Sequence, residues 1–212
     1  MKLRQIALGG GILALAACST QLGLPNKANS AQFDRTKLPI AEPRPEKVTK
    51  VLPSEVPLPP QWEVTAPADA PNVVIILLDD VGYAAPSAFG GVVNMPTAEK
   101  LARNGLRYNK FHTTALCAPT RAALKSGRNH HKVNTGSIPE IATGYAGNST
   151  VVPDYAVPVA EILRLNGYNT AAFGKWHETP GRETTAAGPQ TRWPTRQGFE
   201  QFYGFVGAED NM

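Results

Sequence analysis

A cysteine and an arginine lie four residues apart in the segment CAPTR, residues 117–121, where the sequence predicts the start of a helix. A short helical pattern follows and Gly127 ends it, so Cys117 and Arg121 would lie one turn apart on the same face. A thiol at a helix N-terminus beside a cation has its thiolate favoured, and the backbone N–H groups there form an anion site. One helical face would therefore carry a nucleophile and a cation.

Two adjacent carboxylates, Asp79 and Asp80, directly follow a run of six apolar residues, 73–78. The run is β-branched in its first four positions, which is typical of a strand buried on both faces. Carboxylates at the carboxyl end of such a strand lie where open α/β sheets place their sites, and they offer hard oxygen ligands to a divalent cation. Alternatively, one aspartate caps a turn while the other is solvated. The pair is a candidate metal site.

A third group of polar residues follows a short predicted strand, residues 169–173, in the segment GKWH. Taken alone, Lys175 would be a surface lysine and His177 a partly buried histidine. Further histidines could lie near the site, but we interpret them as structural: His112, His130 and His131. Arg128 could reinforce the positive field or simply lie near the helix end, where cations are favoured.

The elements that must position these residues alternate between strands and helices, which predicts an α/β layer fold. After the strand at 73–78 we expect a helix over 97–104, between Pro96 and Gly105, and a second, half-exposed strand over 106–111. Residues 129–153 are rich in Gly, Asn, Thr and Pro and must be mostly loop. A helix over 159–165 and the strand over 169–173 complete the pattern.

The N-terminal segment, residues 1–17, is typical of an export signal. Two basic residues precede an apolar stretch, residues 6–17, that is too short to span a bilayer as a stable helix. Its end, Leu-Ala-Ala before Cys18, resembles the lipobox of bacterial lipoproteins, which predicts a lipid-modified Cys18 that anchors the protein to a membrane. By resemblance to bacterial sorting rules, Ser19 in place of an aspartate then favours the outer membrane, with the anchored protein in the periplasm. The alternative is an ordinary secretory peptide with an unrelated cysteine, and both interpretations predict export.

A proline-rich segment, residues 18–71, separates this signal from the predicted domain. It contains ten of the chain's 19 prolines and little periodic apolar pattern, so it is either a tether or an extended arm packed across the domain. The chain has a net charge of +4 but no block of Lys and Arg and no basic residues interleaved with aromatic ones. Because nucleic-acid-binding proteins usually show such patterns, we expect no nucleic-acid partner. Both cysteines have separate explanations, so no disulfide is expected.

The order of strand, Asp-Asp, helix, Cys-x-Pro-x-Arg and Gly-Lys-Trp-His resembles the N-terminal half of the sulfatase family. The resemblance runs roughly from Asn72 to Asp210 and includes the segments RWP, residues 192–194, and GFEQFYGF, residues 198–205. It implies an alkaline phosphatase-like sandwich with a mostly parallel central sheet flanked by helices, of which residues 72–212 are the N-terminal part. Thr120 and Ser126 stand where the family usually has serine and threonine, and both keep a hydroxyl.

The resemblance also implies the roles of the polar residues. Cys117 would be oxidised by a maturase to formylglycine, the catalytic residue. Arg121 and Lys175 would hold the sulfate oxygens, and His177 would be the hydrogen-bond partner and base of the formylglycine. Asp79 and Asp80, with the residue made from Cys117, would bind a divalent cation, commonly Ca²⁺ and otherwise one such as Mg²⁺.

The expected function is therefore hydrolysis of sulfate esters by an arylsulfatase-like enzyme. Two alternatives remain open: a formylglycine-dependent phosphonate or phosphate ester hydrolase, and a catalytically silent surface lipoprotein. The sequence ends at Met212, before the downstream Asp-Asn metal ligands, second histidine and second lysine of the family. We therefore expect residues 72–212 to be an incomplete, truncated catalytic domain with little activity alone.

Overall fold

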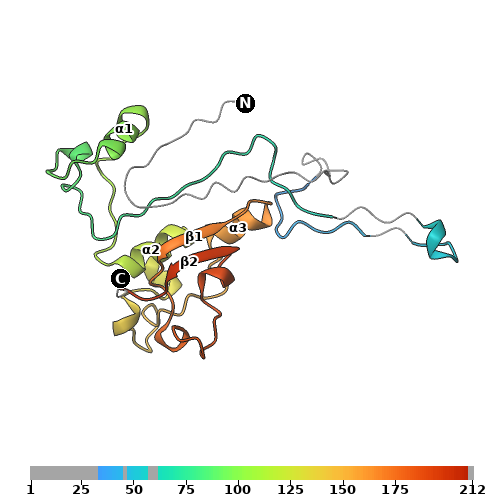
Figure 1. The fold of residues 1–212 in the computed structure, drawn as a ribbon. Coiled ribbons are helices and arrows are strands. Elements are labelled where there is room, and N and C mark those ends of the chain that lie inside the picture. Colours follow the sequence, from blue (N-terminus) through green and yellow to red (C-terminus); the bar gives the residue numbers. More distant parts are fainter. Residues whose placement is uncertain (1–32, 45–46, 57–61, 210–212) are drawn as a thin grey trace. The chain divides into compact units, whose positions relative to one another are not determined.

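The structure is a computed structural model of the chain, and it describes residues 33–44, 47–56 and 62–209. The predicted export signal, residues 1–17, and the predicted lipid anchor Cys18 lie outside the described residues. Contacts between residues divide the chain into two compact units (Figure 1). Among the described residues, unit 1 consists of 75–112, and unit 2 consists of the segments before Ile75 and after His112.

Unit 1 contains the first predicted helix. Helix α1 spans Pro96–Asn104, one residue longer than expected, and begins at a proline whose fixed φ suits the first helical position. Before it, a 3-10 helix, Ser87–Phe89, is followed by Gly90 at φ +86°. Arg107 donates a hydrogen bond of 2.7 Å to the carbonyl oxygen of Ala88 and so ties the segment after α1 to this turn.

Two strands that the sequence predicts near unit 1 are absent from the described structure. Residues 73–78 form no strand and pair with no strand of the described chain, and their side chains are exposed, Val74 by 78%. Residues 106–111 likewise form no strand, and Leu106 is 85% exposed. The predictions of a buried strand and a half-exposed strand are therefore wrong for this structure. An apolar run becomes a strand only where a neighbouring backbone accepts its hydrogen bonds, and none of the described segments does so.

Unit 2 is built around two parallel strands, β1 (Ala171–Lys175) and β2 (Gln201–Phe205), which lie side by side in Figure 1. Ala171 pairs with Gln201 and Lys175 with Phe205, in register along the whole pair. The first strand lies two residues later than predicted, and the second was not predicted as a strand. Together with the helices of unit 2, this parallel pair confirms the predicted α/β class.

Helices α2 (Cys117–Ser126) and α3 (Val159–Leu165) have the bounds that the sequence predicts. Helix α2 ends because Gly127 adopts φ +64°, where its N–H bonds the carbonyl of Ala123. A small buried core of Ala122, Val133 and Ala156 packs α2 against the loop that follows it. Residues 129–153 are mostly loop, as predicted, with two short 3-10 helices, His130–Val133 and Pro139–Ile141.

Part of the proline-rich segment contacts, within unit 2, the residues that follow α3. Arg35 donates hydrogen bonds to the carbonyl oxygens of Thr65, at 2.6 Å, and Asn166, at 2.7 Å. The N–H of Ala66 bonds the carbonyl of Gly167 at 3.1 Å. These contacts are of the kind an extended arm makes, while the division of the chain at residues 17 and 71 stays a prediction. In the described part of the chain, every helix is too short or too polar to cross a membrane.

Candidate active site

Cys117 is the first residue of α2 and is partly buried. The preceding Leu116 is extended, and its side chain gives the helix no cap. Its carbonyl oxygen instead lies 2.8 Å from the Thr114 hydroxyl and 2.9 Å from the Thr120 hydroxyl, and the two hydroxyl oxygens lie 2.6 Å apart. With one hydrogen each, the two hydroxyls make two of these three bonds at a time. The two threonines therefore fix the turn that delivers Cys117 to the start of the helix.

His177 provides the polar contact of the thiol. Its Nδ1 lies 3.0 Å from Cys117 Sγ, although the two residues are 60 apart in sequence. The imidazole is buried, with 1% of the residue exposed, and the backbone adopts φ +55° two residues after the end of β1. A left-handed histidine is strained by about 1–3 kcal/mol, a strain that is common where a side chain must be aimed at a site.

Glu140 contacts the other nitrogen of the same imidazole. Its two carboxylate oxygens lie 3.0 and 3.1 Å from His177 Nε2. Burial raises the pKa of the Glu140 carboxyl, but the hydrogen bond from His177, a backbone hydrogen bond and the charges of His177 and Lys175 bring it below its ordinary 4.5. Glu140 was missed by the sequence analysis, and no local signal marks it, because it lies in a loop 37 residues before His177.

Arg121 and Lys175 meet at the junction of α2 and β1. Arg121 Nη1 donates a hydrogen bond of 2.7 Å to the backbone carbonyl of Lys175. This contact fixes the guanidinium one turn after Cys117 and next to the segment that carries His177. Unit 2 therefore brings together the four residues that the sequence nominates for catalysis, whose roles remain predictions: Cys117, Arg121, Lys175 and His177.

A buried ion pair lies beside these residues. Lys125, near the end of α2, contacts the carboxylate of Glu178, and the exposed fractions of the two side chains are 17% and 6%. Lys125 Nζ also lies 3.0 Å from the centroid of the Trp176 ring. Burial lowers the pKa of Lys125 well below its ordinary 10.5, and the charge of Arg121 lowers it further. The pair joins α2 to the residues on both sides of His177.

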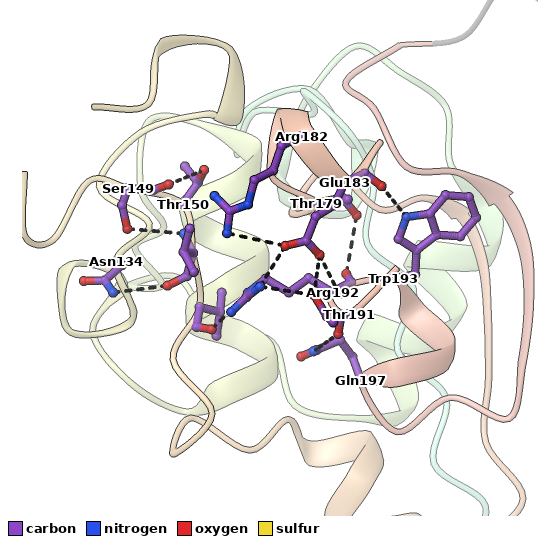
Figure 2. A network of polar contacts seen from close by, with 12 residues as sticks. Asn134, Ser149, Thr150, Thr179, Arg182, Glu183, Thr191, Arg192, Trp193 and Gln197 are labelled. Atoms are coloured by element: carbon purple, nitrogen blue, oxygen red, sulfur yellow. Dashed lines mark hydrogen bonds and ion pairs between the residues drawn. The ribbon is translucent and has the colours of Figure 1, made fainter. Parts of the chain in front are cut away.

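The loop after His177 is closed by a polar network around Glu183 (Figure 2). The buried carboxylate accepts hydrogen bonds from the Arg192 side chain at 2.7 Å, the Arg192 N–H at 2.9 Å and the Thr191 hydroxyl at 2.8 Å. Trp193 Nε1 donates to the Glu183 carbonyl at 2.5 Å. Burial raises the pKa of Glu183, but the hydrogen bonds from Thr191 and Arg192 and the charge of Arg192 lower it below 4.5.

Two of the three predicted metal ligands belong to unit 1. Asp79 and Asp80 are exposed in a turn, with Asp80 at φ +51°, while Cys117 belongs to unit 2. The carboxylate pair suits a hard divalent cation chemically. Nowhere among the described residues do three or more His, Cys, Asp or Glu side chains gather as a metal site, so the predicted set of Asp79, Asp80 and Cys117 stays a prediction.

The three histidines interpreted as structural, and Arg128, have ordinary surroundings. The rings of His130 and His131 lie 4.2 Å apart, and His130 Nδ1 lies 3.1 Å from the Thr135 carbonyl oxygen. The Arg128 guanidinium lies over the Tyr155 ring at 5.7 Å. His112 is exposed in unit 1.

The comparison with known proteins decides the family. Residues 71–212 match the sequence model of the sulfatase family. The chain belongs to the sulfatase family. It is 32% identical over 155 residues to an uncharacterised sulfatase of Schizosaccharomyces pombe. The matched residues cover 69% of this chain and 26% of that relative. It is also 32% identical to an arylsulfatase of Klebsiella aerogenes and 35% identical to human arylsulfatase A, each over 68% of this chain.

This sulfatase chain spans 26–30% of the length of those three relatives. Among solved structures it is similar to the crystal structure of Ps i-CgsB, with 29% sequence identity and a TM-score of 0.47. That similarity covers 63% of this chain and 27% of Ps i-CgsB. Residues 71–212 are therefore an N-terminal part of a sulfatase, and unit 2 shows the α/β architecture of that part.

Proposed function

We propose that this sulfatase chain carries the nucleophile of an arylsulfatase-like sulfuric ester hydrolase, with Cys117 converted to formylglycine by a maturase. The contact of Cys117 Sγ with His177 Nδ1 at 3.0 Å is the observation that supports the proposal most directly. The surroundings of Cys117 suit the modified residue, because its side chain is partly buried at a helix start, with a base on one side and Arg121 one turn on.

The residues of the site would then have separate catalytic roles. One hydroxyl of the formylglycine hydrate would attack the sulfur and displace the alcohol of the ester, and the second would lose its proton and expel sulfate as the aldehyde re-forms. His177 Nδ1, within hydrogen-bond distance of the side chain at 117, would take the proton of the second hydroxyl. Arg121 and Lys175 would place positive charge where the sulfate oxygens and the developing negative charge lie.

Asp79 and Asp80 would hold the divalent cation, for which Ca²⁺ or Mg²⁺ suits their hard oxygen atoms. Its charge would lower the pKa of the attacking hydroxyl. Ca²⁺ takes roughly 6–8 oxygen ligands, so two carboxylates and one hydroxyl would leave most of the shell to other groups or water. We further propose, from the sequence, that the protein is exported and anchored to the outer membrane by lipid on Cys18.

The first experiment measures conversion of Cys117. The chain is coexpressed with a formylglycine-generating maturase, and the peptide that contains residue 117 is analysed by mass spectrometry. We expect the thiol to be replaced by an aldehyde in wild type, with Cys117→Ala as the unconverted control. An unmodified thiol after coexpression would contradict the proposal and favour a catalytically silent lipoprotein.

The second experiment separates sulfate from phosphorus chemistry. The converted protein is assayed with an aryl sulfate and with a phosphonate monoester, beside His177→Ala and Cys117→Ala. We expect turnover of the sulfate that is low beside that of full-length sulfatases and that both substitutions abolish. Faster turnover of the phosphonate would instead support the alternative phosphonate or phosphate ester hydrolase.

A further inference from the structure

We propose that Glu140 is a positioning residue that fixes the tautomer and orientation of His177, so that Nδ1 presents a lone pair to the side chain at position 117. The catalytic consequence rests on the proposed function, but the positioning itself does not. The observation behind it is a continuous chain of contacts from the Glu140 carboxylate, through the two nitrogens of one buried imidazole, to Cys117 Sγ.

The chemistry of the carboxylate assigns the protons. An ionised glutamate only accepts hydrogen bonds, and both of its oxygens lie within 3.1 Å of His177 Nε2. The shared hydrogen must therefore lie on Nε2. In a neutral imidazole one nitrogen is a donor and the other an acceptor, so Nδ1 is left with its lone pair toward Cys117. The opposite tautomer would aim an N–H at the side chain from which a base must accept a proton.

The burial of His177 makes Glu140 the group that decides between the tautomers. The imidazole side chain is only 2% exposed, whereas that of Glu140 is 47% exposed. Water therefore has little access to the ring, while hydrogen bonds and the charges of His177 and Lys175 keep the carboxylate ionised against the cost of its partial burial. The lowered pKa of Glu140 agrees with a carboxylate that is ionised at neutral pH.

The loop that carries Glu140 is held by its own contacts. The 3-10 helix Pro139–Ile141 begins at a proline and closes with a bond from the Ala142 N–H to the Pro139 carbonyl. Around it, the Ser137 hydroxyl bonds Asn148 Oδ1 at 2.5 Å, and the Thr143 N–H bonds the Asn148 carbonyl at 2.9 Å. Asn148 thus joins the two ends of the segment, and the carboxylate is presented from a supported turn.

The decisive experiment is nitrogen NMR of the His177 ring in the unconverted chain at neutral pH. Two-bond proton–nitrogen correlations distinguish an Nε2–H ring from an Nδ1–H ring. Wild type is compared with Glu140→Ala and with Glu55→Ala, a matched control on an exposed glutamate in another proline-started 3-10 helix, Pro53–Glu55. We expect Nε2–H in wild type and the control, and a mixture or Nδ1–H in Glu140→Ala.

Two results of that experiment would overturn the proposal: Nδ1–H in wild type, or a Glu140→Ala ring unchanged from wild type. Since Cys117 is unconverted in these samples, failure of the proposed sulfatase chemistry cannot affect the outcome. If Glu140→Ala does not fold, Glu140→Leu replaces it, because leucine keeps the bulk of the side chain but has no group that can accept from Nε2–H. An Nε2–H fraction below that of wild type in Glu140→Leu supports the proposal, and an unchanged fraction refutes it.

A second readout uses the converted enzyme and an aryl sulfate. Loss of a carboxylate that orients a functional histidine typically costs about 10–100-fold. We expect this loss in kcat for Glu140→Ala with KM within about two-fold, since the residue acts through His177 and not on the substrate. Glu140→Asp should recover part of kcat. A rise in KM with kcat unchanged would refute the positioning role.

Discussion

Replacing Glu178 by alanine should destabilise unit 2 far more than the loss of an ordinary surface ion pair. The substitution leaves the ammonium of Lys125, only 17% exposed, without its carboxylate partner. Breaking a buried pair in this way typically costs about 3–5 kcal/mol. The cost has an upper limit, because the lysine can lose its proton instead. From an ordinary pKa of 10.5, deprotonation at pH 7 costs about 1.4 kcal/mol for each of 3.5 pH units, or about 5 kcal/mol.

The paired replacement of both residues by leucine should behave differently. The variant Lys125→Leu/Glu178→Leu removes two charges from a site beside the buried Trp176 ring, and such swaps are often neutral or stabilising by about 1–4 kcal/mol. Glu178 Oε1 favours that outcome, since it is buried and finds no hydrogen-bond partner among the described residues. The double variant should therefore be at least about 3 kcal/mol more stable than Glu178→Ala.

The assay is urea unfolding followed by tryptophan fluorescence, at pH 7 and again at pH 9. The matched control is Glu161→Ala, which removes the partner of Arg164 from the exposed pair on α3 and should cost at most about 1 kcal/mol. The loss in Glu178→Ala should shrink at pH 9, because a neutral lysine then costs only about 2 kcal/mol. A Glu178→Ala loss no larger than that of Glu161→Ala, or a double variant as unstable as the single one, would refute the reasoning.

Two further predictions concern the elements around the site. Because the folded-state pKa of Glu183 lies below 4.5, its ionised form stabilises the protein above about pH 4.5, and this contribution is lost as the pH falls through the folded-state value. Glu183→Gln should therefore be less stable than wild type at pH 7 and lose less stability between pH 5 and pH 3, as measured by urea unfolding; an identical pH dependence would contradict this. Gly204→Ala should cost about 1–3 kcal/mol, because the new Cβ would overlap the carbonyl oxygen of the paired Gly174, and an unchanged unfolding midpoint would disprove that close contact.

The helices could be predicted from the sequence because their signals are local. Pro96 starts α1, Gly127 ends α2 and Asn166 follows the last residue of α3, so each boundary depends on a residue at that boundary. The strands could not be predicted in the same way. Residues 73–78 have a stronger strand pattern than 201–205, yet only the second run has a partner that accepts its backbone bonds.

The residues of the candidate site likewise differ in whether a local motif marks them. Cys117, Arg121, Lys175 and His177 lie in short motifs, and the contacts between them join motifs that the sequence already singled out. Glu140 could not be found in this way, since its neighbours carry no motif and its contact with His177 depends on the course of a 25-residue loop region, residues 129–153. That course is fixed by tertiary hydrogen bonds rather than by local propensity.

The segment that follows β1 explains how a strained histidine can be held in place. Alternate residues of this segment serve two different surroundings. His177 contacts Cys117 and Glu140, while Trp176 and Glu178, on either side of it, both contact Lys125. The backbone before and after His177 is thus fastened to α2, the same helix that presents Cys117. A φ of +55° persists only where neighbouring contacts outweigh its cost, and here the buried lysine provides them. The ion pair between Lys125 and Glu178 therefore holds the backbone around His177 against α2, and so helps to set the distance between His177 and residue 117.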